Sequence, residues 1–162
     1  MKRLTILFLS LSFLSCSQLM SPQSKSITKK YFPELEIEIN TPAFEKKKGF
    51  TTHEELLTFV NKLQSGHPDI VSIQYIGSSQ KGKQIPMVVF HKNKLSESNS
   101  KVWIQGGLHG NEPASTEGVL YLMDRLLNDN QYTYLLDDLH LAGVPMATID
   151  GYEKHDRYAA NG

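Results

Sequence analysis

The sequence holds a single cysteine, a single tryptophan and no excess of charge of either sign. One cysteine excludes a disulfide framework and a zinc site built from cysteines alone, so a metal would need histidine or carboxylate ligands. The 17 basic and 17 acidic side chains cancel, which removes the basic surface that sequence-independent nucleic-acid binding requires. We therefore expect no nucleic-acid partner. With 40% hydrophobic and 21% charged residues, the 162-residue chain has the composition of a folded globular domain.

The first residues have the pattern of an export signal. A short basic start precedes an apolar run, residues 4–14, which is too short to span a bilayer comfortably. Small Ser15 then precedes Cys16, and this resembles the lipobox of bacterial lipoproteins, whose cysteine is lipidated and becomes the mature N-terminus. We expect a lipoprotein signal peptide over 1–15 and an exported protein, held on the periplasmic or cell-surface side of a membrane by a lipid on Cys16. The alternative is a plain signal peptide with an incidental cysteine.

A polar extension follows the expected lipidation site. Residues 17–30 are rich in serine and lysine and lack apolar periodicity, which predicts a flexible tether. Leu35–Ile39 alternates apolar and acidic side chains, as a short half-exposed strand would. We expect this tether and N-terminal extension to span 16–49 and the folded domain to occupy 50–162.

The body of the chain alternates helical and strand patterns. Thr52 and Glu55 have the spacing of a capping box and precede an apolar stripe of helical period, and a second such stripe follows Pro113. Trp103, in one of the apolar runs, is expected in the core. Because helices and strands alternate, we predict an α/β domain with a mixed parallel and antiparallel sheet flanked by helices. Four β-rich runs predict its strands: 71–76, 85–90, 101–105 and 140–146.

The glycine-bearing segment between the first two predicted strands nearly spells a phosphate loop. Gln84 stands where a magnesium-binding serine or threonine is required. The segment also joins strand to strand, whereas a phosphate loop joins strand to helix. We interpret Gly77–Gly82 as the turn of an antiparallel hairpin.

The most informative stretch runs from Gln105 to Ser115. A strand leads into two glycines, and His109 and Glu112 follow, three residues apart, before Pro113. Imidazole nitrogen and carboxylate oxygen are both zinc ligands, and ligands in open α/β sheets bind at the carboxyl ends of strands. The pattern therefore favours a metal site built from His109 and Glu112.

This stretch resembles the first metal-binding motif of zinc carboxypeptidases of the carboxypeptidase A type, in its bacterial Gly-x-His-Gly-Asn-Glu form. The resemblance implies a metallocarboxypeptidase-like fold and one zinc ion, with His109 and Glu112 as two of its three protein ligands. Residues 144–152 are similar to the family's Asn-x-Asp-Gly turn, with Thr148 in the asparagine position. Arg157 is similar to the family's arginine that polarises the scissile carbonyl.

The resemblance implies zinc-assisted hydrolysis of peptides or of peptidoglycan stem peptides. The family's third histidine ligand, its general-base glutamate and its substrate-binding residues follow an Asp-Leu-Asn-Arg segment, and this sequence ends before that segment. We therefore expect 50–162 to be the N-terminal part of a truncated catalytic domain. Whether this part is active by itself stays open. His140 and His155 are the other candidates for a third ligand.

Two alternatives remain at this point. Aspartoacylase and succinylglutamate desuccinylase, which are amidohydrolases, also use Gly-x-His-Gly-Asn-Glu, although the carboxypeptidase-like hairpin at 71–90 argues against them. A non-catalytic surface lipoprotein that retains the fold is the other alternative.

Overall fold

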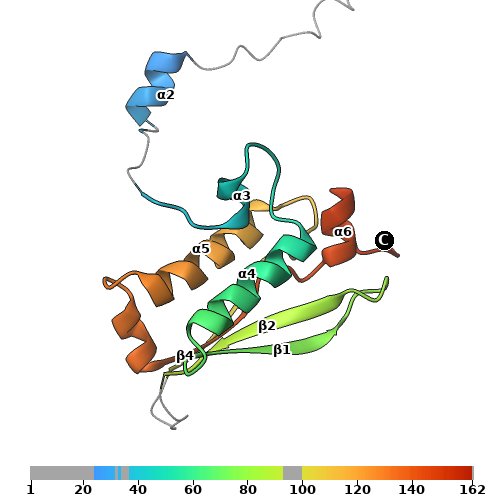
Figure 1. Cartoon of the computed structure of the whole chain (residues 1–162). Coiled ribbons are helices and arrows are strands. Elements are labelled where there is room, and N and C mark those ends of the chain that lie inside the picture. The colour runs from blue at the N-terminus through green and yellow to red at the C-terminus, as the bar shows by residue number, and fades with distance from the viewer. Residues whose placement is uncertain (1–23, 32, 34–36, 93–99, 162) are drawn as a thin grey trace, which may run out of the picture. The chain divides into compact units, whose positions relative to one another are not determined.

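The computed structural model describes residues 24–31, 33, 37–92 and 100–161 (Figure 1). The chain divides into two units, residues 1–37 and 38–162, and each is considered by itself. In the first, α2 (Lys25–Tyr31) is a helix of 7 residues without a buried side chain. This segment, expected to be part of a flexible tether, is thus helical, and two lysines in its last turn suit the negative end of the helix dipole. The expected signal peptide and Cys16 lie outside the described residues.

The second unit is built on a mixed four-stranded sheet in the order β1-β2-β4-β3. β1 pairs antiparallel with β2 and β2 antiparallel with β4, whereas β3 pairs in parallel with β4. The predicted α/β class and mixed sheet are therefore confirmed, and all four predicted strands form. Their bounds are β1 (Val71–Ser78), β2 (Gln84–Phe90), β3 (Ser100–Gln105) and β4 (Leu139–Val144).

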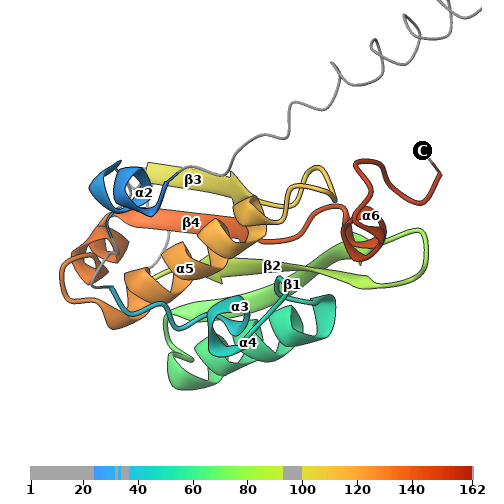
Figure 2. The ribbon, with the colours of Figure 1, turned by 90° about the horizontal axis from the view of Figure 1, so that it is seen from above.

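Two long helices cover one face of this sheet, as the two ribbon views show (Figures 1 and 2). The first is α4 (His53–Gly66), and its capping box forms as predicted, with Thr52 accepting from Glu55 and the Glu55 carboxylate accepting from the Thr52 backbone. The second is α5 (Ala114–Asn128), which follows Pro113. Shorter elements complete the unit: α3 (Pro42–Glu45), the 3-10 helix η1 (Thr133–Asp137) and α6 (Ile149–Lys154).

The core lies between the helices and the covered face of the sheet. Leu56 and Val60 of α4, Leu120 of α5, and Val88 and Phe90 of β2 are fully buried. They occupy the positions that the helical and strand periodicities assign to the inner face. Removing this apolar surface from water is the main stabilising contribution to the unit.

Two local expectations are corrected by the structure. Trp103 is 55% exposed and is not in the core, because its neighbours Val102 and Ile104 point to the helices and alternate residues of a strand face opposite sides. Residues 37–39, the described part of the strand predicted at Leu35–Ile39, are irregular. Alternation of apolar and acidic residues does not supply a neighbouring strand with which to pair, and Ile37 is exposed.

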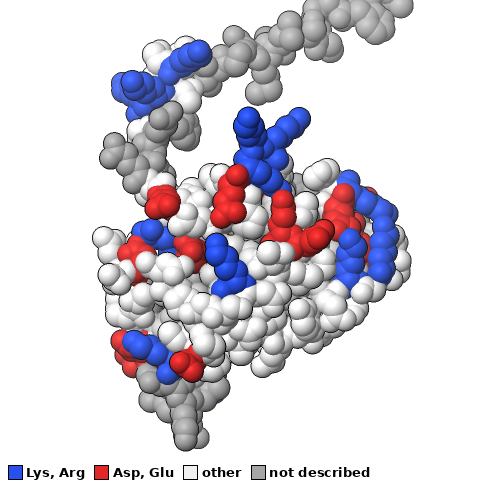
Figure 3. Space-filling view, viewed as in Figure 1, with Lys and Arg blue, Asp and Glu red and all other residues white. Residues whose placement is uncertain are grey.

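Charged residues gather in a few clusters on the face shown in Figure 3, and in most of these clusters both signs lie next to one another. The ion pairs of the structure include Lys46 with Glu55 and Lys83 with Glu153. Within the described ranges of the chain, no helix combines the length and the apolar character needed to cross a membrane.

Candidate metal centre

The loop between β3 and α5 leaves the sheet through two glycines. The Gly106 N–H donates to the carbonyl of Val144 (2.9 Å), which extends the β3–β4 pairing by one residue. Gly107 has a φ of 59°, in the left-handed region that glycine adopts without strain. A Cβ on Gly106 would lie 2.7 Å from the carbonyl oxygen of Pro145. The two glycines thus permit the chain to turn against its neighbour and carry His109 to the carboxyl end of the sheet.

Residues after β4 hold this loop from the other side. The Thr148 N–H donates to the Gly107 carbonyl (2.9 Å), and the Thr148 hydroxyl donates to the Leu108 carbonyl (2.7 Å). Within the loop, the Ser115 hydroxyl accepts from the Gly107 N–H (2.9 Å) and donates to the Glu112 carbonyl (3.0 Å). The polypeptide on both sides of His109 is therefore fixed by hydrogen bonds before any metal is considered.

The structure brings the three predicted site residues together. His109 Nδ1 lies 3.1 Å from Glu112 Oε2, and Arg157 Nη1 lies 2.8 Å from Glu112 Oε1. The Glu112 N–H donates to the His109 carbonyl (3.1 Å), which closes the turn between them. The Glu112 side chain is 56% exposed and that of His109 34%, so both are accessible from solvent.

The two neighbours of Glu112 stabilise its charged form. The hydrogen bond from His109 is the largest cause, and with the hydrogen bond from Arg157 it outweighs the raising effect of burial and holds the pKa of the Glu112 carboxyl below its usual range. A carboxylate kept ionised beside an imidazole is a donor pair suited to a divalent cation.

Close backbone packing brings Arg157 to this loop. The Gly110 N–H donates to the Arg157 carbonyl (3.3 Å). A Cβ on Gly110 would come closer than 3.0 Å to backbone atoms of Gly151, Tyr152 and Asp156. The loop and α6 can approach this closely only because residue 110 lacks a side chain.

Sequence reasoning missed the role of Asp150. Its buried carboxylate accepts from the Ser79 hydroxyl (2.9 Å) and from the Lys81 N–H (3.1 Å), and thereby ties α6 to the β1–β2 turn. That segment is the hairpin turn that we predicted: Gly82, with a φ of 80°, donates to the Ser79 carbonyl (2.9 Å). The aspartate of the Asn-x-Asp-Gly resemblance was the available signal.

The donor set fits part of a zinc site. An imidazole nitrogen and a carboxylate oxygen converge, whereas a catalytic zinc takes three protein ligands. Among the residues that the structure describes, no group of three or more His, Cys, Asp or Glu side chains could hold a metal. His140 is buried in β4, and His155 ends α6 in a left-handed conformation (φ 54°); neither of them joins His109 and Glu112 in such a group.

The model of the zinc carboxypeptidase family, peptidase family M14, matches residues 56–160. The chain belongs to this family. The match covers the sheet, most of α4, all of α5 and the loop that carries His109, so the recognised motif and the fold agree. The family implies a zinc peptidase, and the aspartoacylase-like alternative is not favoured.

Relatives agree with this assignment, and a solved structure shares the fold. Carboxypeptidase 2 of Trichophyton rubrum is 25% identical over 162 residues, covering 89% of this chain and 30% of its own length. The inactive metallocarboxypeptidase ECM14 of Saccharomyces cerevisiae is 28% identical over 108 residues, covering 61% of this chain and 25% of its own length. The crystal structure of carboxypeptidase A from Helicoverpa armigera superposes with a TM-score of 0.64 at 20% identity, over 72% of this chain and 32% of that one. The chain thus spans about a third or less of the length of these proteins.

Proposed function

We propose that this chain supplies the first part of a zinc carboxypeptidase site, in which His109 and Glu112 bind the metal. The observation that carries the proposal is the convergence of His109, Glu112 and Arg157, which lie on segments 45 residues apart, within 3.1 Å. The family match supports the same roles. Bound zinc would polarise a peptide carbonyl and lower the pKa of its water to about 7.

The chain's own residues would prepare this chemistry. The loop hydrogen bonds from Ser115 and Thr148 fix the backbone on both sides of His109, so that binding the metal requires little reordering. Arg157 carries a permanent positive charge at the edge of the site. With a substrate bound, its guanidinium would donate to the scissile carbonyl oxygen and stabilise the negative charge that develops there.

We further propose peptides as the substrate class, with peptidoglycan stem peptides as the finer assignment. Support for peptides comes from the family, and relatives such as that of Trichophyton rubrum are named as carboxypeptidases. Support for stem peptides comes from the expected export, because such peptides lie outside the cytoplasmic membrane.

Metal titration tests the ligand assignment without requiring catalysis. Cobalt(II), a spectroscopic substitute for zinc, is added to the full chain and to its His109→Ala and Glu112→Gln variants, and binding is followed by visible absorbance. Two protein ligands predict weak binding, and we expect either substitution to weaken it about tenfold or more, the equivalent of about 1.4 kcal/mol. His155→Asn is the matched control, since it removes an exposed imidazole and asparagine tolerates the left-handed conformation. Cobalt affinity unchanged by His109→Ala would contradict the assignment.

A non-catalytic role is the second candidate. One relative is named an inactive metallocarboxypeptidase, so the fold occurs in this family without activity. The distinction can be made with a polypeptide extended to the length of the relatives. Release of C-terminal residues from a peptide, lost on Arg157→Ala, supports the enzyme, whereas its absence in a folded, zinc-loaded protein supports the non-catalytic role.

We also propose that the protein is an exported lipoprotein anchored through Cys16. The support is the basic start, the apolar run and the single cysteine of the sequence. Expression in a bacterium with a labelled fatty acid should give a labelled membrane-bound product, and Cys16→Ser should abolish the label. An unlabelled wild-type product in the soluble fraction would refute the anchor.

A further inference from the structure

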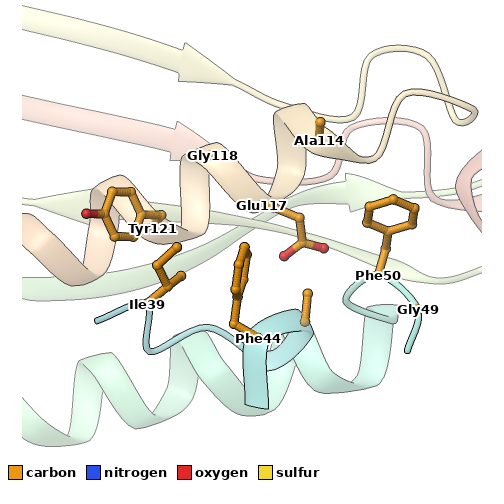
Figure 4. Close-up of a pocket in the computed structure, with 9 residues that line it drawn as sticks. Ile39, Phe44, Gly49, Phe50, Ala114, Glu117, Gly118 and Tyr121 are labelled. Carbon is orange, nitrogen blue, oxygen red and sulfur yellow. The ribbon is translucent and has the colours of Figure 1, made fainter. Parts of the chain in front are cut away.

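A cavity of about 440 Å³ lies between α3, the segment before α4 and the first half of α5 (Figure 4). Its volume is in the range of small-molecule sites. Phe44 and Phe50, at its mouth, are 61% and 48% exposed, although large aromatic side chains usually lose most of their surface on folding. Apolar groups and glycines make up the rest of the wall: Ile39, Ala43, Gly49, Ala114, Gly118 and Tyr121.

Glu117 is the one charged residue in this lining, and its carboxylate points into the space between Phe44 and Phe50 (Figure 4). The residue is 8% exposed. The Thr51 N–H donates to Oε1 and the Thr51 hydroxyl to Oε2, each at 2.7 Å. Within the described parts of the chain, no lysine, arginine or histidine forms an ion pair with Glu117.

Among the described residues, the Glu117 carboxylate therefore keeps hydrogen-bond acceptor sites without a donor and a charge without a counter-charge. A carboxylate accepts about four hydrogen bonds, and Thr51 supplies two. A charge removed from water is costly unless a counter-charge balances it. Burial raises the pKa of the nearby Tyr152 phenol, and the charge of Glu117 raises it further. Lys46 lies between Phe44 and Phe50 in the sequence, but its ion pair is with Glu55 and not with Glu117.

The apolar walls suit one kind of occupant. The faces of aromatic rings attract cations, and this attraction strengthens where water is excluded. The cavity therefore combines a buried negative charge with rings that favour a positive one, and its walls offer an apolar surface to the remainder of a ligand. A neutral apolar ligand would leave Glu117 without a counter-charge.

We propose that this cavity is a binding site for a small organic ammonium ion, with the ammonium group donating to Glu117 and an apolar body lying against Phe44 and Phe50. The site is separate from the candidate metal centre, because neither His109 nor Glu112 lines it. Binding of an ammonium ion in this cavity therefore does not depend on the zinc peptidase function.

Calorimetric titration of the full chain at pH 7 tests the charge requirement. Phenethylammonium is the probe and 2-phenylethanol its neutral counterpart of similar size. We expect the ammonium to bind at least about tenfold more tightly, as a charge-assisted hydrogen bond implies. Glu117→Gln, which can still bond both Thr51 groups, should reduce the ammonium affinity to that of the alcohol. Glu54→Gln, an exposed change on α4, should leave it unaltered.

A second variant keeps the test decisive if Glu117→Gln does not fold. Phe44→Ala removes an exposed ring and should weaken ammonium binding severalfold, whereas Tyr134→Ala, at an equally exposed ring of η1, should not. Equal affinities for the ammonium and the alcohol would overturn the proposal and leave an apolar groove only. The absence of saturable ammonium binding would also overturn the proposal. If the protein instead forms a dimer in sedimentation that Phe44→Ala disperses, and the ammonium does not bind, the surface belongs to a second copy of the chain.

Discussion

Replacing Gly110 by alanine perturbs the contact on which the candidate metal centre depends most directly. The new Cβ would come closer than 3.0 Å to backbone atoms of Gly151, Tyr152 and Asp156. Ordinary contacts between carbon atoms are about 3.5–4.0 Å, so the loop and α6 would have to separate by roughly 1 Å. None of these neighbouring atoms belongs to a flexible side chain that could rotate away.

The expected cost follows from these contacts. Overpacking a well-packed site typically costs about 1–3 kcal/mol. The atoms that must move here are held by backbone hydrogen bonds, among them those from His155 to Tyr152 and from Asp156 to Gly151. We therefore expect the free energy of unfolding to fall by about 3 kcal/mol, the upper end of that range. Separation of the two segments should also break the Arg157–Glu112 ion pair.

Urea unfolding followed by circular dichroism measures this change. Gly118→Ala is the matched control, because a Cβ there would have no atom within 4 Å and alanine is better than glycine within a helix by about 0.5–1 kcal/mol. The same substitution should thus destabilise at position 110 and stabilise at position 118. A Gly110→Ala protein as stable as the wild type would refute the close packing of the loop on α6.

Two further predictions concern other hydrogen-bonded carboxylates. Asp150→Asn removes the charge that ties α6 to Ser79, and we expect it to lower the free energy of unfolding by about 1–3 kcal/mol and to speed amide exchange in the hairpin turn; unchanged exchange would contradict this role. In the folded chain the pKa of Glu55 lies below its ordinary value of 4.5, and the hydrogen bond from Lys46 is the main cause. Stability from Glu55 is therefore present above pH 4.5 and lost as the pH falls through the lowered pKa. Glu55→Gln, which can keep the capping box, should flatten the loss of stability below that pH; an acid profile identical to that of the wild type would exclude this contribution.

The parts of the fold predicted from the sequence depend on local spacing. The capping box at Thr52 and Glu55 and the turn from His109 to Glu112 each involve residues three apart, so the chain itself places them together. The strand runs could be identified because apolar β-rich segments are bounded by turns. Their order in the sheet could not, since β4 enters between β2 and β3 by pairing with residues far away in the sequence.

The parts that escaped prediction depend on distant contacts. Arg157 can be assigned to the candidate site from the sequence only by the family resemblance, because no local pattern relates it to Glu112. Glu117 lies just before the apolar stripe of α5, and its burial depends on Thr51, 66 residues earlier. The sequence also misplaces Trp103, because a strand pattern shows two faces without showing which one the helices cover.

The position of β4 in the sheet also affects the order in which the molecule can form. β3, which leads to His109, has β4 as its strand partner in the described sheet. During synthesis that partner emerges more than 30 residues after β3, and contacts between distant segments form slowly because a long loop must close first. We expect the hairpin of β1 and β2 to form early and the metal-site loop to become ordered late, so that a ribosome-bound chain ending before β4 would leave His109 and Glu112 on a loop that follows an unpaired strand.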